Sequence, residues 1–434
     1  MNRKVNHFLL LIRNSFKKFY FGFISSHSYL SFQQIETIEK VYNNPRQDVV
    51  LRYENQFSKM VGDGKAISYA SARMGFYSLM KLLGIGPGDE VVLPAATCSV
   101  MANAIFRLGA IPIYADIDKN TFGSGLKGIK DVVSSNTKMI VAQHSFGIPC
   151  NIEPIVEFAK SRSIFLLEDC ALTFDSSLNG ISVGNFGDAA IFSTDRSKPL
   201  NTLLGGLVYS RDIDLVLRLE ELDESLTLSD YKQKAIFDYF KFQLLHCNEE
   251  NIARFSILYF LRSIFKKIFT PGSVTPFLDE DFSEASAHSY PYPAKLPPFL
   301  AQIGQFELDN WLEKKTKKKK SLGEFLKYSR TMKVYKFLPS AYFDSSLEIT
   351  PHRIIWSQER GEKIRKKLSK LIDVSWIWFL RPIVSTDKPL SNFKYIESSC
   401  PISEDLGSGM INIPIVYNPE SQKYLFDMVL KVIK

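Results

Sequence analysis

A regular alternation of strand-like and helix-like segments between residues 66 and 210 constrains the fold of this chain more than any other feature. Short apolar runs such as "IPIYADI", "TKMIVAQHS" and "SIFLLEDC" are interleaved with segments such as "ARMGFYSLMKLLGI", whose apolar positions recur at helical spacing. This alternation predicts an α/β fold, with a largely parallel sheet covered by helices on both faces. In such a sheet, ligands bind at the carboxyl ends of the strands.

The rest of the chain is organised around this α/β region, because 434 residues are too many for one simple core. We predict an N-terminal extension over 1–65, a large α/β domain over 66–310 and a smaller α+β domain over 311–434. An aromatic-rich helical insertion at about 211–290 interrupts the large domain. Around the last boundary, "FLAQIGQFELDNWLEKKTKKKK" predicts one helix, "WIWFLRPIV" and "MINIPIV" predict strands, and "ESQKYLFDMVLKVI" predicts a final helix.

The formal net charge of +8 is concentrated in the first 20 residues and in "EKKTKKKKS" at 313–321. We interpret both stretches as solvated helix faces, in preference to surfaces that attract phosphate-rich partners or an anionic membrane. No motif resembles a nucleic-acid-binding one, so we expect no nucleic-acid partner. Lys266 and Lys267 beside aromatic residues in "FLRSIFKKIF" keep peripheral membrane contact open as an alternative.

Several absences point to a cytoplasmic protein. The chain has no run of about 18 apolar residues that would span a membrane. Its early apolar run "FLLLI" is interrupted by Arg13 and is short for a signal peptide. The five cysteines have neither metal-binding nor disulfide spacing, which suits a reducing compartment, and we predict no metal site.

Three of the expected strand ends carry residues suited to one cofactor. "SIFLLEDC" ends in Glu168 and Asp169, and "DAAIFS" ends in Ser193, five residues before Lys198. "ISYASAR" opens a helix whose first N–H groups suit a phosphate. The acidic pair is either a cap or turn carboxylate, or a carboxylate at the ligand edge. A carboxylate, a lysine and an anion seat together fit pyridoxal phosphate (PLP): the lysine forms a Schiff base with it and the carboxylate keeps its ring nitrogen protonated.

Six segments, in order, resemble the DegT/StrS-type sugar aminotransferase family of fold-type-I PLP enzymes. They are "LGIGPGDEVVLPAATC", "LGAIPIYADIDKNTF", "FLLEDCA", "GNFGDAAIFSTDRSKPLNTLLGG", "KLPPFLAQIGQFELDN" and "CPISEDLGSGMINIPI". The resemblance implies a large domain with a mainly parallel seven-stranded sheet and a small C-terminal α+β domain. It also implies amino transfer from an amino acid, with glutamate as the expected donor, to a nucleotide-linked keto-sugar. This reaction would serve bacterial surface polysaccharide biosynthesis, such as that of O-antigen (lipopolysaccharide) or capsule, in a homodimer with shared active sites.

The resemblance also implies roles for single residues. Lys198 would form the Schiff base and move the proton, while Asp169 would pair with the pyridine nitrogen. Ser193 and the backbone N–H groups of Ala72 and Arg73 would hold the phosphate. Lys295 falls where the family has an arginine that reaches the phosphate of the neighbouring subunit.

The chain departs from the family pattern at four positions. Cys98 stands where an aromatic residue often stacks on the cofactor, and Leu172 stands where a glutamine often contacts it. Pro293 replaces an asparagine, and Arg73 replaces a threonine. These departures leave a catalytically lapsed PLP-fold scaffold as an alternative. A sugar dehydratase on the same fold is another, although it would have a histidine at the position of Lys198.

Three further questions stay open at this level. A membrane-associated assembly component that uses the N-terminus and the insertion is a third alternative function. His144 either lines the pocket or is a structural histidine with satisfied hydrogen bonds. Cys98 and Cys170 are interpreted as packing residues rather than nucleophiles, because no basic activator is evident beside them.

Overall fold

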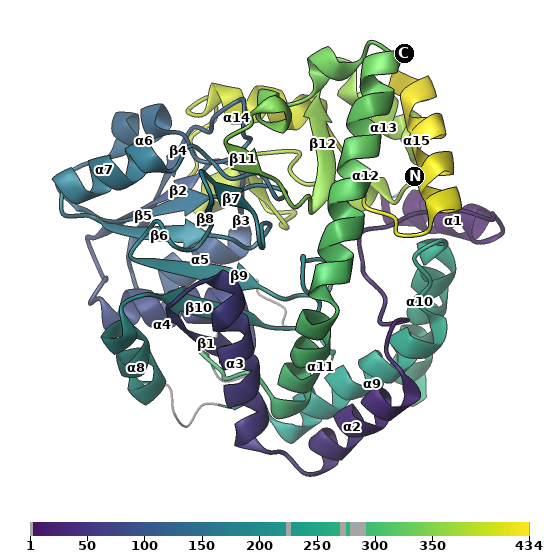
Figure 1. The fold of residues 1–434 in the computed structure, drawn as a ribbon, viewed down its shortest axis with the longest axis horizontal. Coiled ribbons are helices and arrows are strands. Elements are labelled where there is room, and N and C mark those ends of the chain that lie inside the picture. Colours follow the sequence, from purple (N-terminus) through teal and green to yellow (C-terminus); the bar gives the residue numbers. More distant parts are fainter. Residues whose placement is uncertain (1–2, 223–226, 270–274, 278–291, 434) are drawn as a thin grey trace.

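The computed structural model describes residues 3–222, 227–269, 275–277 and 292–433 (Figure 1). Parts of the predicted insertion therefore lie outside the described residues. A seven-stranded sheet forms the centre, in the order β1-β10-β9-β6-β5-β2-β4. β10 runs antiparallel to both of its neighbours, and the other neighbouring strands are parallel, as expected for the predicted fold. The strands are β1 (Lys65–Tyr69), β2 (Glu90–Pro94), β4 (Ile111–Ala115), β5 (Thr137–Gln143), β6 (Phe165–Asp169), β9 (Ala189–Ser193) and β10 (Gly206–Ser210).

The central strands bury side chains on both faces of the sheet. In β5, Met139 and Val141 join one apolar core, whereas Ile140 and Ala142 join another. The first core includes side chains of α4 (Ala72–Leu82) and α5 (Ser99–Arg107), and the second includes those of α6 (Leu126–Val132) and α7 (Glu153–Ser161). The strand segments therefore read as nearly continuous apolar runs, as expected for a doubly covered parallel sheet.

Helices from the N-terminal region and from the predicted insertion extend the large core. α2 and α3 pack against α11, where a Cβ atom on Gly304 would lie 2.4 Å from the ring of Tyr53, so glycine allows the close approach. α1 packs against α10 (Figure 1). These helices are α1 (Arg3–Ser15), α2 (Phe32–Asn43), α3 (Gln47–Val61), α8 (Ile213–Leu222), α9 (Asp230–His246), α10 (Ile252–Phe269) and α11 (Pro298–Asp309).

The C-terminal region forms a separate apolar core around a two-stranded antiparallel sheet of β12 and β14. The large buried side chains Phe325, Trp356 and Phe426 meet there. The elements of this region are α12 (Trp311–Thr331), β12 (Arg353–Ser357), α13 (Gly361–Leu368), β13 (Ile383–Val384), α14 (Pro401–Gly409), β14 (Met410–Pro414) and α15 (Pro419–Ile433).

Two secondary-structure expectations are wrong in this region. The single helix expected from residue 299 is two helices, α11 and α12, which meet at Asn310. "WIWFLRPIV" is not one strand: it begins in a 3₁₀ turn and contributes only β13, which pairs with β3 (Thr97–Cys98). The consecutive residues Trp376, Ile377 and Trp378 all line one cavity, which the alternating side chains of a strand could not do.

The lysine-rich stretch at 313–321 is only partly the solvated face that its composition suggests. Lys314 pairs with Glu307 at 3.0 Å and Lys315 pairs with Asp175 at 2.7 Å. The Lys318 side chain is buried. Separately, no helix in the described part of the chain has the length and apolarity needed to cross a membrane.

Candidate active site

A cavity of about 1370 Å³ opens at the carboxyl ends of β6 and β9. Its other walls are the start of α4, the loop after β9, and C-terminal segments around residues 353 and 375–389. All of the predicted site residues except Lys295 line this cavity: Ala72, Arg73, Cys98, Asp169, Leu172, Ser193 and Lys198. Folding therefore brings these positions, which are up to 126 residues apart, to one edge of the sheet, since 198 − 72 = 126.

The acidic pair at the end of β6 divides between the two faces of the sheet. Leu167 belongs to the core of α4 and α5, and Asp169, two residues on, points the same way, into the cavity. Asp169 Oδ1 accepts a hydrogen bond of 2.9 Å from the Ala171 N–H. Burial raises the pKa of this carboxyl, although the Ala171 N–H and the nearby Lys198 act in the opposite direction. Asp169 is thus the carboxylate at the ligand edge.

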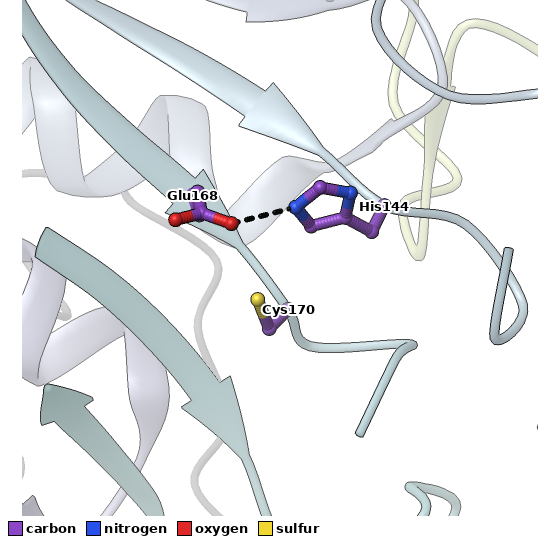
Figure 2. Close-up of side chains that lie close together, drawn as sticks. All are labelled: His144, Glu168 and Cys170. Atoms are coloured by element: carbon purple, nitrogen blue, oxygen red, sulfur yellow. Dashed lines mark hydrogen bonds and ion pairs between the residues drawn. The ribbon is translucent and has the colours of Figure 1, made fainter. Parts of the chain in front are cut away.

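Glu168 is a structural residue on the opposite face. Its oxygens accept hydrogen bonds from the backbone N–H groups of Gly184, Phe186 and Gly187 at 2.7–2.8 Å. Figure 2 shows the fourth contact, 2.9 Å between Glu168 Oε2 and His144 Nε2. The fully buried carboxylate thereby ties β6 to the loop that leads into β9.

His144 is a structural histidine rather than a pocket residue. Its side chain is fully buried, and Nδ1 accepts from the Cys150 N–H at 3.0 Å, so Nε2 carries the proton that is donated to Glu168. His144, Glu168 and Cys170 have potential ligand atoms within 4.8 Å of one another (Figure 2). Because the histidine nitrogens and the carboxylate oxygens already have partners, we assign no metal here. Burial raises the pKa of the Cys170 thiol, in keeping with a packing role.

Lys198 lies in the loop between β9 and β10. Its backbone N–H donates to Asp195 O at 2.9 Å, and Nζ lies 5.3 Å from the centre of the Trp378 ring. Burial lowers the pKa of the Lys198 amine, while nearby acidic groups, Asp195 and Asp169 among them, act in the opposite direction. A lysine in this setting exists as the neutral, nucleophilic amine to a greater extent than a surface lysine does.

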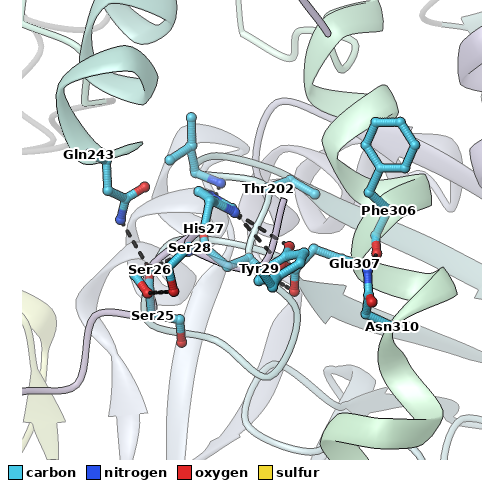
Figure 3. Close-up of polar contacts among 12 residues, drawn as sticks. Ser25, Ser26, His27, Ser28, Tyr29, Thr202, Gln243, Phe306, Glu307 and Asn310 are labelled. Carbon is cyan, nitrogen blue, oxygen red and sulfur yellow. Dashed lines mark hydrogen bonds and ion pairs between the residues drawn. The ribbon is translucent and has the colours of Figure 1, made fainter. Parts of the chain in front are cut away.

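Hydrogen bonds join the loop that carries Lys198 to the N-terminal segment around Ser25, and Figure 3 shows this segment beside Gln243 and Glu307. The Ser25 N–H donates to Arg196 O at 3.2 Å, and the Ser25 carbonyl accepts from the side chains of Asn201 and Gln243 at 2.8 and 3.0 Å. The Asn201 N–H donates to the buried Glu307 at 3.2 Å. Residues from before the sheet and from α11 therefore fix the backbone of this loop, and Gln243 of α9 holds Ser25 in place.

The start of α4 forms a polar corner of the cavity. Ser71 is the N-cap residue, but its side chain makes no capping bond, and its buried Oγ has no hydrogen-bond partner among the described residues. The first N–H groups of a helix, here those of Ala72 and Arg73, have no acceptor within the helix. A Cβ atom on Gly206 would lie 2.2 Å from Ala72 N, so only glycine lets β10 approach this corner. The corner offers several donors to an anion, with Ser193 lining the same cavity.

The sequence reasoning missed the C-terminal wall of the cavity, which includes Arg353, Trp376 and Trp378. Arg353 is buried in β12, donates from Nη1 to Trp376 O at 2.9 Å, and lies 4.1 Å from the centre of the Phe23 ring. Its Nε has no hydrogen-bond partner and no carboxylate pairs with it in the described part of the chain. Burial lowers the pKa of this guanidinium to about 9. A basic residue within the apolar run "RIIW" was the signal available in the sequence.

Lys295 lies elsewhere. It forms an isolated bridge with Tyr69, and its Nζ lies 5.2 Å from the centre of the Tyr69 ring, at the end of β1. It is not among the residues that line the cavity of its own chain. Its role at a neighbouring subunit stays a prediction.

Solved structures show which class of fold this is. Aminotransferase TlmJ from Streptoalloteichus hindustanus matches with a TM-score of 0.69 and 19% identity, over 95% of this chain and 98% of that one. The PLP form of Spr1654 from Streptococcus pneumoniae matches with a TM-score of 0.67 and 17% identity, over 96% and 98%. The chain thus has the α/β fold of these aminotransferases.

Sequence comparison gives a family match over part of the chain. Residues 32–236 match the DegT/DnrJ/EryC1/StrS aminotransferase family. GDP-perosamine synthase of Escherichia coli O157:H7 is 34% identical over 177 residues, which are 41% of this chain and 49% of that protein. The chain spans about half the length of the curated relatives it matches.

Proposed function

We propose that this protein is a PLP-dependent aminotransferase that moves an amino group from an amino acid to a nucleotide-linked keto-sugar. One observation carries the proposal: Lys198, Asp169 and the polar corner at α4 line the same cavity. Glutamate as donor and a surface polysaccharide as the eventual product follow from the family resemblance, and the similarity to a GDP-perosamine synthase supports a nucleotide sugar as acceptor.

The residues present fit PLP. Its phosphate would be held by the N–H groups of Ala72 and Arg73. Ser193 and the Ser71 hydroxyl, which has no partner among the described residues, would be further donors. The ring nitrogen would face Asp169, and Cys98 and Leu172 would line the ring with apolar surface where the family often has an aromatic residue and a glutamine. When bound, PLP supplies an aldehyde that takes up the amino group and a ring that absorbs an electron pair.

The protein side chains would do the following work. Lys198, whose pKa is lowered by burial, would be the neutral amine that holds the cofactor, and its Nζ would accept and return the substrate proton. Asp169 would be the carboxylate that keeps the ring nitrogen protonated. Trp378, which packs over the Lys198 amine, limits access of water to that nitrogen.

Arg353 is the residue we assign to the carboxylate of the amino donor. It is a buried cation without a carboxylate partner among the described residues, on the wall of the cavity that also holds Lys198. A desolvated guanidinium gains most from a bidentate anion, which a carboxylate provides. We further propose a homodimer, in which Lys295 contributes to the phosphate site of the other subunit.

Absorbance spectroscopy of the purified full chain tests the proposal. With PLP added, we expect a visible band that glutamate bleaches as 2-oxoglutarate appears. Lys198→Ala should lack the band, whereas the surface substitution Lys160→Ala should retain it. A panel of nucleotide-linked keto-sugars should then restore the band by accepting the amino group.

The outcomes separate the alternatives. If circular dichroism shows that the wild-type chain is folded but no band forms, the protein is not a PLP enzyme. If the band forms and no amino acid bleaches it, the aminotransferase assignment is wrong while cofactor binding stands.

A further inference from the structure

The helices α1 and α10 expose an unusual number of large apolar side chains. On α1, Val5, Leu9 and Ile12 recur at spacings of four and three residues, which places them in one stripe, and Phe16, directly after the helix, is 84% exposed. On α10 the exposed apolar side chains are Leu258, Phe260, Leu261, Ile264, Phe265, Ile268 and Phe269. Single exposed apolar residues are ordinary, but clustered ones mark an interaction surface.

The two sets belong to neighbouring helices and so form one surface, here called the α1–α10 face. The rings of Phe8 and Phe260 lie 4.7 Å apart, and Arg254 Nε donates to Ser15 O at 2.7 Å. Figure 1 shows α1 and α10 at the edge of the molecule, away from the central sheet. The face therefore lies outside the cavity walls, and none of its exposed apolar residues lines the cavity.

The charge on these helices has one sign. Neither α1 nor α10 contains an aspartate or a glutamate, whereas they contain the basic residues Arg3, Lys4, Arg13, Arg254, Arg262, Lys266 and Lys267. Lys266 lies 3.7 Å from Asp238 of α9, but within the described residues no acidic group pairs with Arg13 or Lys267.

The end of α13 adds more positive charge beside α1. Asn14 Nδ2 donates to Ser369 O at 3.2 Å, which brings the exposed Lys366, Lys367 and Lys370 next to the end of α1. Burial lowers the pKa of Lys17, and the nearby positive charges of Arg13 and Lys370 lower it further, so cations gather at this point. Apolar side chains with a basic border are typical of a surface that lies in a membrane interface.

The sign of the charge decides between two occupants. A second copy of this chain would apply the same face to itself, because symmetric dimer interfaces use one patch on both subunits, and it would bring like charges together. An anionic lipid surface instead attracts the lysines and arginines while its acyl region takes up the phenylalanine and leucine side chains. We propose that the α1–α10 face binds peripherally to an anionic bilayer. The proposal does not rest on the catalytic assignment.

Flotation of the full chain with vesicles tests this proposal. The probes are vesicles of phosphatidylcholine alone and of phosphatidylcholine mixed with phosphatidylglycerol. We expect the chain to float with the mixed vesicles at low salt, to remain at the bottom with the neutral ones, and to be released by high salt.

Variants locate the surface. Phe265→Ser combined with Phe269→Ser should weaken vesicle binding by about tenfold or more, because both side chains are exposed and their rings stack on each other at the surface. Lys267→Glu should weaken binding by at least about fivefold. The matched controls are Leu312→Ser, an equally exposed apolar residue on α12, and Lys160→Glu on α7, and neither should change binding.

Three results would overturn the proposal. The first is a chain that stays at the bottom of the gradient with anionic vesicles. The second is binding that the control variants weaken as much as the α1–α10 variants do. The third is a protein that does not bind vesicles and that light scattering shows to change from dimer to monomer with the phenylalanine substitutions, since a second copy would then occupy the face.

Discussion

Two adjacent carboxylates, Glu168 and Asp169, should respond in opposite ways to the same isosteric change. Glu168→Gln keeps the size of the side chain but replaces one acceptor oxygen with an NH₂ group. Each oxygen of Glu168 accepts from two N–H donors: Oε1 from Phe186 and Gly187, and Oε2 from Gly184 and His144. Either orientation of the amide therefore sets its NH₂ group against two donors.

His144 cannot relieve this conflict by changing tautomer. Its Nδ1 already accepts from the Cys150 N–H, so moving the proton from Nε2 to Nδ1 only transfers the clash. Hydrogen bonds to charged groups contribute about 1.5–3 kcal/mol each, so the loss of two predicts that Glu168→Gln lowers the free energy of unfolding by about 3–6 kcal/mol. Urea denaturation followed by circular dichroism measures this change.

Asp169→Asn should leave the free energy of unfolding within about 1 kcal/mol of wild type, because the amide oxygen can still accept from the Ala171 N–H. It should instead abolish glutamate-driven bleaching of the PLP band, since a neutral amide cannot hold the ring nitrogen protonated. The reasoning fails if Glu168→Gln unfolds at the wild-type urea concentration, or if Asp169→Asn is the more destabilised of the two.

Three further substitutions test other parts of the structure. Gly206→Ala should weaken PLP binding at least about tenfold, since its Cβ would meet Ala72 N at 2.2 Å, whereas Gly323→Ala, with open space around it, should leave an equilibrium dialysis measurement unchanged. Burial lowers the pKa of Lys318 to about 8, so between about pH 8 and 10.5 the unfolded chain keeps a proton that the folded chain has lost. Over this range the free energy of unfolding should therefore rise by about 3 kcal/mol more in wild type than in Lys318→Met. Urea titrations that give the same pH dependence for both proteins would contradict this. Arg353→Gln should raise KM for the amino donor by about tenfold or more and leave KM for the keto-sugar within about twofold, and steady-state kinetics that shift both equally would refute the carboxylate assignment.

The strands of the sheet could be predicted because their information is local. The apolar runs that form this sheet, such as "SIFLLEDC", lie between turn residues and form strands at the expected positions. The ligand edge followed from the parallel arrangement of strands, which places Asp169, Ser193 and the start of α4 together. These positions could therefore be predicted without knowing which distant parts of the chain contact them.

The different roles of Glu168 and Asp169 could not be read from the sequence. β6 is buried on both faces, so its apolar residues do not alternate with polar ones and give no indication of which side chain faces which side. In the structure, Leu166 and Leu167 pack in different cores, which shows that successive side chains of β6 face opposite sides of the sheet. The structure decided which carboxylate faces the cavity.

The C-terminal wall of the cavity was beyond local reasoning for a different reason. Arg353 and Trp378 reach the cavity only because the C-terminal core docks beside the sheet edge, more than 150 residues along the chain from Lys198, since 353 − 198 = 155. Aromatic residues in "WIWFLR" looked like a buried strand because an aromatic-rich apolar run is typical of one. Here the same residues line a cavity and keep an irregular backbone.

The N-terminal region links the two inferences about this molecule. α1 carries the proposed membrane face, and the chain that follows it runs to Ser25, whose backbone is bonded to Arg196 and Asn201 in the loop of Lys198. On the way, Phe21 exchanges hydrogen bonds with Leu371 and Asp373 of the C-terminal region. The Tyr20 N–H donates to Glu250 O, just before α10, and the Tyr20 carbonyl accepts from the Ile252 N–H, at the first residue of α10. Because these hydrogen bonds fix the segment at several points along its length, it can move little relative to the rest of the molecule. The region before the sheet is therefore part of the framework that positions the candidate catalytic lysine, and lipid binding at α1 would act on a rigidly attached helix rather than on a loose tail.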